Sequence, residues 1–161
     1  MRLALLVAGT IALFGAAPAF ASSIGASEVG NIFCQARVSG DMTKIDTLIS
    51  PALKEAIATA EAKNAAAEKQ YPGDKPPLGD GIPWASSPDQ PPQCTVMGAS
   101  GTADHPEVVL YYQFPDSAAN RSDRLYLSFI NDELRIDDVI YSDDSRLTGS
   151  LTSVFEDAPA P

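Results

Sequence analysis

The fold is decided in residues 124–141, which read RLYLSFINDELRIDDVIY. Apolar and polar residues alternate on both sides of Asn131–Glu133, a sequence typical of a tight hairpin turn. The alternation predicts antiparallel strands over 124–130 and 134–141. It breaks at Asp138, so we expect a β-bulge there that returns the apolar residues after it to the core.

Two further segments extend this pattern into a sheet. Residues 107–114 alternate with the same period of two, and residues 94–99 predict another strand. Turns and polar loops separate the four segments, as is typical of antiparallel neighbours. We therefore expect one curved antiparallel sheet with an apolar face against helices.

Helical patterns come earlier in the chain. Apolar residues recur every three or four positions from Val29 to Ala36, which is one face of a helix. Ser27 is placed to cap this helix and Gly40 to end it. Asp41 can cap a second, short helix.

Ser50-Pro51 is a start signal for a third helix that continues to about Lys69. Ser145 can cap a last short helix after the strands. Helices followed by a run of antiparallel strands define the α+β class. The expected architecture is N-terminal helices packed on one cone-like curved sheet, with a short C-terminal helix.

An export signal precedes these elements. A positive start at Met1-Arg2 is followed by an uncharged apolar run over 3–14 and by the cleavage site Ala19-Phe20-Ala21. The run is too short to span about 30 Å of hydrocarbon. We therefore expect a cleaved signal peptide over 1–21 and a periplasmic or secreted protein.

The rest of the chain is expected to form a single domain over 22–156, followed by a disordered tail at 157–161. Proline and glycine dominate residues 71–93, which predicts a long loop. Within it, Ile82-Pro83-Trp84 is apolar, and we expect it to anchor the loop on the core. The alternative is that Trp84 lines a binding pocket.

The two cysteines, Cys34 and Cys94, follow the predicted cleavage site. An isolated pair in an oxidising compartment usually forms a disulfide. The sequence therefore predicts a bridge from the first helix to the first strand.

Charge excludes some partners. The net charge is −10, and removal of residues 1–21, whose only charged residue is Arg2, makes it −11. Nucleic acid and anionic membrane surfaces require clustered basic residues instead. We expect a protein or small-molecule partner that the sequence does not identify, no membrane span, and a homodimer as a candidate assembly.

No catalytic residue, metal ligand or cofactor is predicted. His105 is the only histidine and lies in a predicted turn. The chain contains neither a G-x-S-x-G nucleophile motif nor a glycine-rich phosphate loop. The acidic residues Asp137, Asp138, Asp143 and Asp144 are expected to form a solvated rim, with a cation site or a shared proton as the alternative.

Several short segments, including Phe33-Cys34, Ile82-Pro83-Trp84 and the predicted strand over 134–141, resemble corresponding segments of small exported bacterial proteins. These proteins belong to the nuclear-transport-factor-like superfamily, also called the cystatin-like cone fold. The resemblance covers most of residues 27–155. It implies a curved sheet wrapped around helices, often with a concave pocket that some members use for acid–base catalysis. No active-site motif matches position by position, so no catalytic role is carried over.

Aromatic residues on the strands are the remaining candidates for a pocket, with core packing as the alternative. The candidate pocket residues are Trp84, Tyr111, Tyr112, Tyr126, Tyr141 and Asp138.

Three functions follow as hypotheses. The first is an exported non-enzymatic binding domain of the bacterial cell envelope. The second is a pocket enzyme of the isomerase or dehydratase type that uses an Asp–Tyr pair. The third is an acidic inhibitor or immunity-type protein against a basic cell-wall hydrolase. A deep pocket with an Asp beside a Tyr would favour the enzyme, and a filled cone would favour the binding domain.

Overall fold

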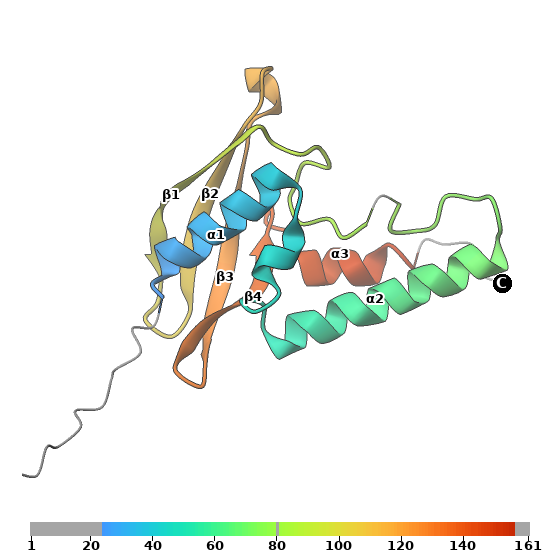
Figure 1. The fold of residues 1–161 in the computed structure, drawn as a ribbon, viewed down its shortest axis with the longest axis horizontal. Helices are drawn as coiled ribbons and strands as arrows, with labels where there is room; N and C mark the ends of the chain where they lie inside the picture. The colour runs from blue at the N-terminus through green and yellow to red at the C-terminus, as the bar shows by residue number, and fades with distance from the viewer. Residues whose placement is uncertain (1–23, 80, 157–161) are drawn as a thin grey trace, which may run out of the picture.

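The computed structural model describes residues 24–79 and 81–156, so the predicted signal peptide and the tail at 157–161 lie outside the described residues. The chain is an α+β protein, as predicted (Figure 1). Its elements are, in order, α1 (Ala26–Ser39), η1 (Met42–Ile45), α2 (Pro51–Gln70), β1 (Gln93–Gly101), β2 (Pro106–Gln113), η2 (Ser117–Ala119), β3 (Arg121–Ile130), β4 (Glu133–Ile140) and α3 (Leu147–Ser153).

The four strands form one curved antiparallel sheet in the order β1-β2-β3-β4. Asn131 and Asp132 join β3 to β4 with φ angles of 52° and 63°. Two consecutive positive φ angles are the signature of a type I′ hairpin turn. The register shifts between Tyr126 and Leu127, which leaves Asp137 as an extra residue of β4. The predicted bulge is therefore confirmed.

Helix α1 packs on β1 and β2 (Figure 1). The Cys34–Cys94 disulfide joins α1 to β1 across a Cα–Cα distance of 5.2 Å, as predicted. Gly40 ends the helix with a φ of 73°. The predicted cap at Ser27 is wrong, because the helix starts earlier, with Gly25 at the N-cap position, and Ser27 already lies in its first turn.

Helix α2 begins as predicted, with the Ser50 hydroxyl accepting the Leu53 N–H at 3.1 Å. It lies beside α3, and both helices extend away from the sheet (Figure 1). The predicted Ser145 cap of α3 is wrong. Its hydroxyl and its N–H both donate to the Asp143 carboxylate, and the helix begins later, at Leu147.

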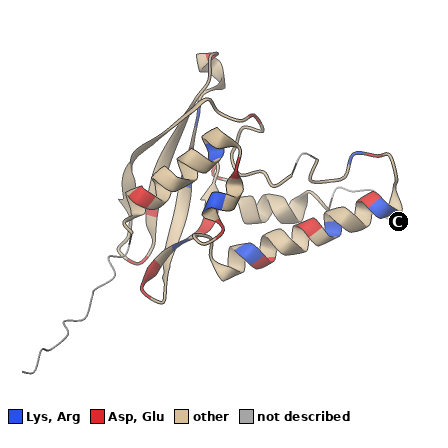
Figure 2. Cartoon of the chain, in the orientation of Figure 1, with Lys and Arg blue, Asp and Glu red and all other residues tan. Residues whose placement is uncertain are grey.

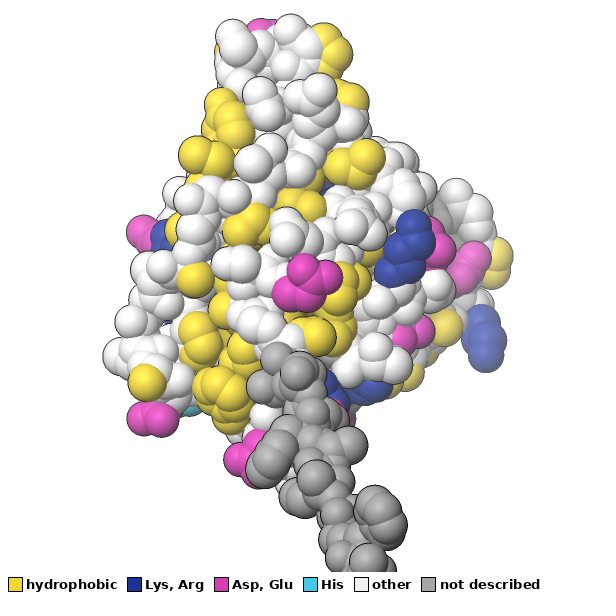
Figure 3. Space-filling model, turned by 60° about the vertical axis from the view of Figure 1, so that its left-hand side comes forward, with side chains coloured by type: hydrophobic (Ala, Val, Ile, Leu, Met, Phe, Trp, Pro, Cys, Tyr) yellow, Lys and Arg dark blue, Asp and Glu magenta, His cyan; other side chains and the backbone are white. Residues whose placement is uncertain are grey.

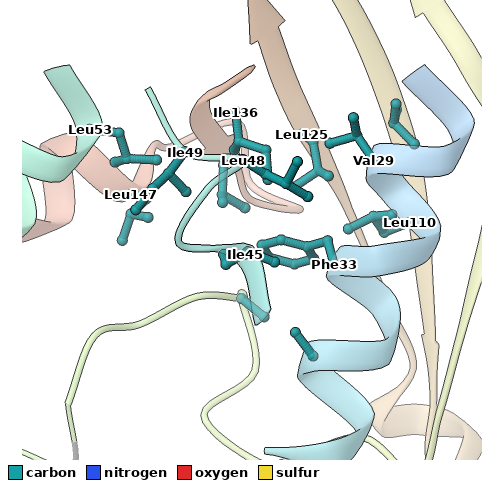
Figure 4. Close-up of a cluster of buried hydrophobic side chains, with 14 of the residues drawn as sticks. Val29, Phe33, Ile45, Leu48, Ile49, Leu53, Leu110, Leu125, Ile136 and Leu147 are labelled. Atoms are coloured by element: carbon teal, nitrogen blue, oxygen red, sulfur yellow. The ribbon is translucent and has the colours of Figure 1, made fainter. Parts of the chain in front are cut away.

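A single cluster of buried side chains fills the space between the helices and the sheet (Figure 4). Phe33 of α1 meets Ile45 of η1 and Leu110 of β2, while Leu53 and Leu147 join α2 and α3 to the same cluster. The core therefore connects these helices to the sheet.

Candidate functional site

Part of the long loop between α2 and β1 lies on the core. We call residues 82–86 the strap. Ile82 and Trp84 pack against the buried cluster, and Ala85 is buried. The half-buried Trp84 ring meets Phe33 edge-on, with centroids 6.3 Å apart and planes at 72°. The strap is thus an anchor of the loop on the helix-covered side of the sheet.

Two side chains of the sheet region hold the strap through its backbone. The Tyr141 hydroxyl donates to the Pro83 carbonyl. The Ser86 N–H donates to Asp123 Oδ2 at 2.9 Å. Because Tyr141 follows β4 and Asp123 lies on β3, the strap is fastened to two strands rather than resting on the surface.

A cluster of polar side chains lies between the end of the strap and the elements beneath it. Tyr112 and Asp123 both face the core, and Asp123 pairs with Leu110, two residues before Tyr112. Asp123 is 0 % and Tyr112 is 1 % exposed. We call Arg37, Ser86, Tyr112 and Asp123 the buried polar cluster, because within the described part of the chain each has a buried polar atom without a hydrogen-bond partner.

Burial controls the protonation of this cluster. It raises the pKa of the Asp123 carboxyl, although hydrogen bonds from Ser86 and the backbone of Ser142 oppose the shift. Burial, and then the neighbouring Asp123 charge, raises the pKa of the Tyr112 hydroxyl far above its usual value. Burial also raises the pKa of Tyr141. Both tyrosine hydroxyls therefore stay protonated, and the raised pKa of Asp123 favours the protonated form of this carboxyl beside Tyr112.

The predicted pocket residues divide between two sides of the sheet. Trp84, Tyr112 and Tyr141 lie together at the strap. Tyr111 and Tyr126 point to the opposite side, as the period of two requires for Tyr111 next to Tyr112.

Tyr126 has its own partners on that outer side. Its ring stacks on His105 with centroids 5.3 Å apart, and the Arg146 guanidinium lies 5.1 Å from the ring centroid. The Tyr111 hydroxyl accepts a hydrogen bond from Asn120. Neither tyrosine belongs to the buried polar cluster.

Asp138 pairs across the sheet with Tyr126 and is also outside the cluster. Its carboxylate accepts hydrogen bonds from the N–H and hydroxyl of Thr148, at 3.2 and 2.7 Å, and lies 3.7 Å from Arg146. Thr148 is the second residue of α3, so Asp138 supplies from β4 the capping acceptor that the helix lacks locally. This role explains a buried carboxylate without invoking a ligand.

Sequence reasoning missed Asp123, Ser86 and Arg37. The signal for Asp123 was available, because it precedes Leu125 by two residues and so belongs to the core face of β3. The strand predicted from the alternation begins at Arg124, whereas β3 begins at Arg121, so Asp123 lies outside the predicted strand.

A groove of about 360 Å³ lies beside the strap. Leu78 and Pro83 line it from the loop, and Ser150 and Val154 line it from α3 and the residue after it. It contains no residue of the buried polar cluster, so it does not give access to Asp123.

The described residues hold no group of three or more His, Cys, Asp or Glu side chains that could bind a metal ion. No helix in the same part of the chain is long and apolar enough to cross a membrane.

The fold and the site together define a disulfide-linked α+β protein with a strap fastened over a buried polar cluster. A scan against protein-family models found no match to this chain, and searches of curated proteins and of solved structures found none either.

Proposed function

We propose that this protein is an exported, non-enzymatic binding domain of the bacterial cell envelope, which contacts its partner through its outer surface. The observation that carries the proposal is the closure of the interior. Asp123 and Tyr112, the pair best suited to acid–base chemistry, are 0 % and 1 % exposed beneath the strap. A catalytic group must reach its substrate, so closure supports a structural role for both.

Export is supported by two features. The sequence predicts a signal peptide over 1–21, and the structure contains the Cys34–Cys94 disulfide, a bond typical of oxidising compartments. Helices followed by a curved antiparallel sheet also agree with the element order expected from the nuclear-transport-factor-like resemblance. We include membership of that superfamily in the proposal.

A pocket enzyme is the second candidate, favoured by one observation. Asp123 Oδ1 and the Tyr112 hydroxyl are buried near each other without hydrogen-bond partners among the described residues. Such a pair could act on a small molecule if the strap lifted away from Tyr141 and Asp123. The two functions therefore differ in how often the strap opens.

Native-state hydrogen exchange separates them. The Ser86 N–H, which donates to Asp123, is compared with the N–H of Leu125 in β3 as a reference for global unfolding. A binding domain with a closed interior exchanges both amides with similar free energies of opening. Exchange of Ser86 through a frequent local opening, with Leu125 still protected, would contradict the proposal and favour the enzyme.

Partner binding supplies a second test. A double variant, Asp123→Asn with Tyr112→Phe, removes the acid–base groups and keeps their shapes. Photo-cross-linking in the bacterial envelope should give the same adducts for this variant as for the wild type. Loss of the adducts from a variant with an unchanged circular dichroism spectrum would count against binding through the outer surface.

A further inference from the structure

A groove of about 610 Å³ runs along helix α1, and we call it the α1 groove. The helix contributes Glu28, Asn31, Gln35 and Val38 to its lining, and their spacing places them on one face of the helix. The core-facing residues of α1, such as Phe33, lie on another face. Figure 3 brings the start of α1 forward and shows hydrophobic side chains between polar ones on this side of the molecule. The described lining contains no residue of the buried polar cluster, so the α1 groove is a separate feature.

The α1 groove has an apolar floor and a polar rim. Cys34 is buried, and Cys94 and Val38 are half-buried, whereas Asn31 and Gln35 are exposed. The Cys34–Cys94 disulfide joins α1 to β1, so it fixes the floor of the groove. None of the described lining residues is aromatic. Sites for small molecules are lined mostly by hydrophobic and aromatic side chains, so this lining is a better match to an extended polypeptide.

The spacing of the two amides on the rim matches a polypeptide backbone. Asn31 and Gln35 are one helical turn apart, a rise of about 6 Å along the axis. In an extended chain, peptide groups that face the same way recur about every 6.6 Å. A side-chain amide both donates and accepts, so each can pair with the N–H and C=O groups of the backbone. Neither amide has a hydrogen-bond partner within residues 24–79 and 81–156, so both are available.

Opposite charges mark the two ends of the α1 groove (Figure 2). Glu28 lies in the first turn of α1, and Lys44 of η1 donates to the hydroxyl of Ser39, the last residue of α1, at 2.9 Å. From Glu28 to Ser39 the helix rises by about 16 Å. An extended chain covers that length with about five residues. Neither Glu28 nor Lys44 forms an ion pair with another described residue, so both charges can bind a partner.

We infer that the α1 groove binds an extended segment of a partner protein, about five residues long, with a basic side chain beside Glu28 and a carboxylate beside Lys44. The backbone of the segment pairs with Asn31 and Gln35, and a small apolar side chain in its middle faces the floor. The net charge of −10 attracts the basic end of the segment during the encounter. The inference rests on the proposed function, because it names the surface and the kind of partner through which the binding domain acts.

A capped pentapeptide of sequence Lys-Ser-Val-Ser-Glu is the probe. In an extended chain its lysine, valine and glutamate face the same side, so they can reach the two charged ends and the floor. Titration of the isotopically labelled wild-type protein at low salt should shift the NMR resonances of the α1 and η1 amides. A peptide with glutamine at both ends should bind at least fivefold more weakly, and added salt should reduce the difference.

Charge reversal at one end of the groove tests the orientation of the charges. Glu28→Lys should weaken binding of the probe at least tenfold, and it should favour a peptide with glutamate at both ends. The matched control is Glu61→Lys, which makes the same change at an exposed glutamate of α2, outside the groove. This control should bind the probe within twofold of the wild type.

Removal of the two amides tests the pairing with the backbone. Asn31→Ala with Gln35→Ala keeps both charges and places good helix formers on α1, so the fold should be retained, as circular dichroism can check. Binding of the probe should weaken at least fivefold. Unshifted α1 resonances at millimolar wild-type titration, or equal effects of Glu28→Lys and Glu61→Lys, would overturn the inference.

The same double variant separates this inference from the proposed function. Photo-cross-linking in the bacterial envelope should lose the adducts that the wild type forms. Adducts that persist in the double variant would overturn the assignment to the α1 groove while leaving a binding domain that contacts its partner elsewhere on its outer surface.

Discussion

At Asp123 the chain places a carboxylate where the pattern of β3 calls for an apolar residue. The residues that share its face, Leu125 and Leu127, are fully buried, and so is Asp123. Burying a charge is unfavourable unless it is hydrogen-bonded. The hydrogen bond from Ser86 supplies part of that compensation and fixes the strap to the sheet.

The raised pKa of Asp123 gives stability a defined pH dependence. The folded state binds this proton more tightly than the unfolded state, whose carboxyl titrates near 3.8. Stability from this group is therefore fully present below that pH and is lost as pH rises through the folded pKa. Asp123→Asn keeps an acceptor for Ser86 but cannot ionise. Urea unfolding between pH 4 and 8 should show a smaller loss of stability with rising pH in the variant, and parallel curves for both proteins would contradict this assignment.

The two buried tyrosines at the strap should respond in opposite ways to loss of the hydroxyl. The Tyr112 hydroxyl has no partner among the described residues, so Tyr112→Phe removes a desolvated group and should leave the melting temperature unchanged or raise it. Tyr141→Phe leaves the Pro83 carbonyl without its donor and should cost about 1–3 kcal/mol. Thermal unfolding of the two variants side by side is the measurement. Equal changes in melting temperature would contradict the difference in hydrogen bonding between the two hydroxyls.

The strap is the element that joins loop, helix and sheet. Trp84 contacts Phe33 on α1, while its neighbours are bonded to Tyr141 and Asp123. The loop beyond the strap is also held, because the Gln90 amide donates to the Val38 carbonyl at 2.7 Å. The sequence predicted the anchor at Trp84, but not the hydrogen bonds that hold Ser86 and Gln90.

Trp84→Ala should destabilise the fold by about 3 kcal/mol, because the half-buried indole leaves its contact with Phe33. Tyr71→Ala, in the exposed start of the same loop, is the control and should change stability little. Urea unfolding of both variants measures the difference. Trp84 is the only tryptophan, so the emission of the wild type should also be partly protected from iodide. A Trp84→Ala variant as stable as the control would contradict the prediction that Trp84 anchors the loop on the core.

Elements whose signals are local were predictable from the sequence. The type I′ turn at Asn131, the bulge at Asp137 and the Ser50 cap depend on a few neighbouring residues, and all three are present in the structure. The start of α3 was not predictable, because the residue that caps this helix, Asp138, lies on strand β4. Asp123 and Ser86 likewise meet only after the chain has folded across 37 positions.

At the scale of the whole molecule, the disulfide closes the chain around most of its helical part. Cys34 and Cys94 are separated by 60 positions, and the enclosed segment contains η1, α2 and the strap. The bridge therefore fixes α1 against β1 on the side where the loop returns to the sheet. β1 is an edge strand, so apart from the bridge it is held by its pairing with β2 and by its packing against α1.

Removing the disulfide should therefore lower the free energy of unfolding by more than the loss of its local contacts alone. Closing a loop of this length restricts the unfolded chain and contributes about 4 kcal/mol in the chain-entropy model. The double variant Cys34→Ser with Cys94→Ser should lose a similar amount in urea unfolding, and reduction of the wild type should reproduce the loss. Because the strap keeps its own bonds to Asp123 and Tyr141, Trp84 emission under native conditions should change little. A loss of stability below about 1 kcal/mol would show that the unfolded chain stays compact without the disulfide. A red-shifted Trp84 emission in the folded variant would show that the disulfide, and not the sheet, holds the strap in place.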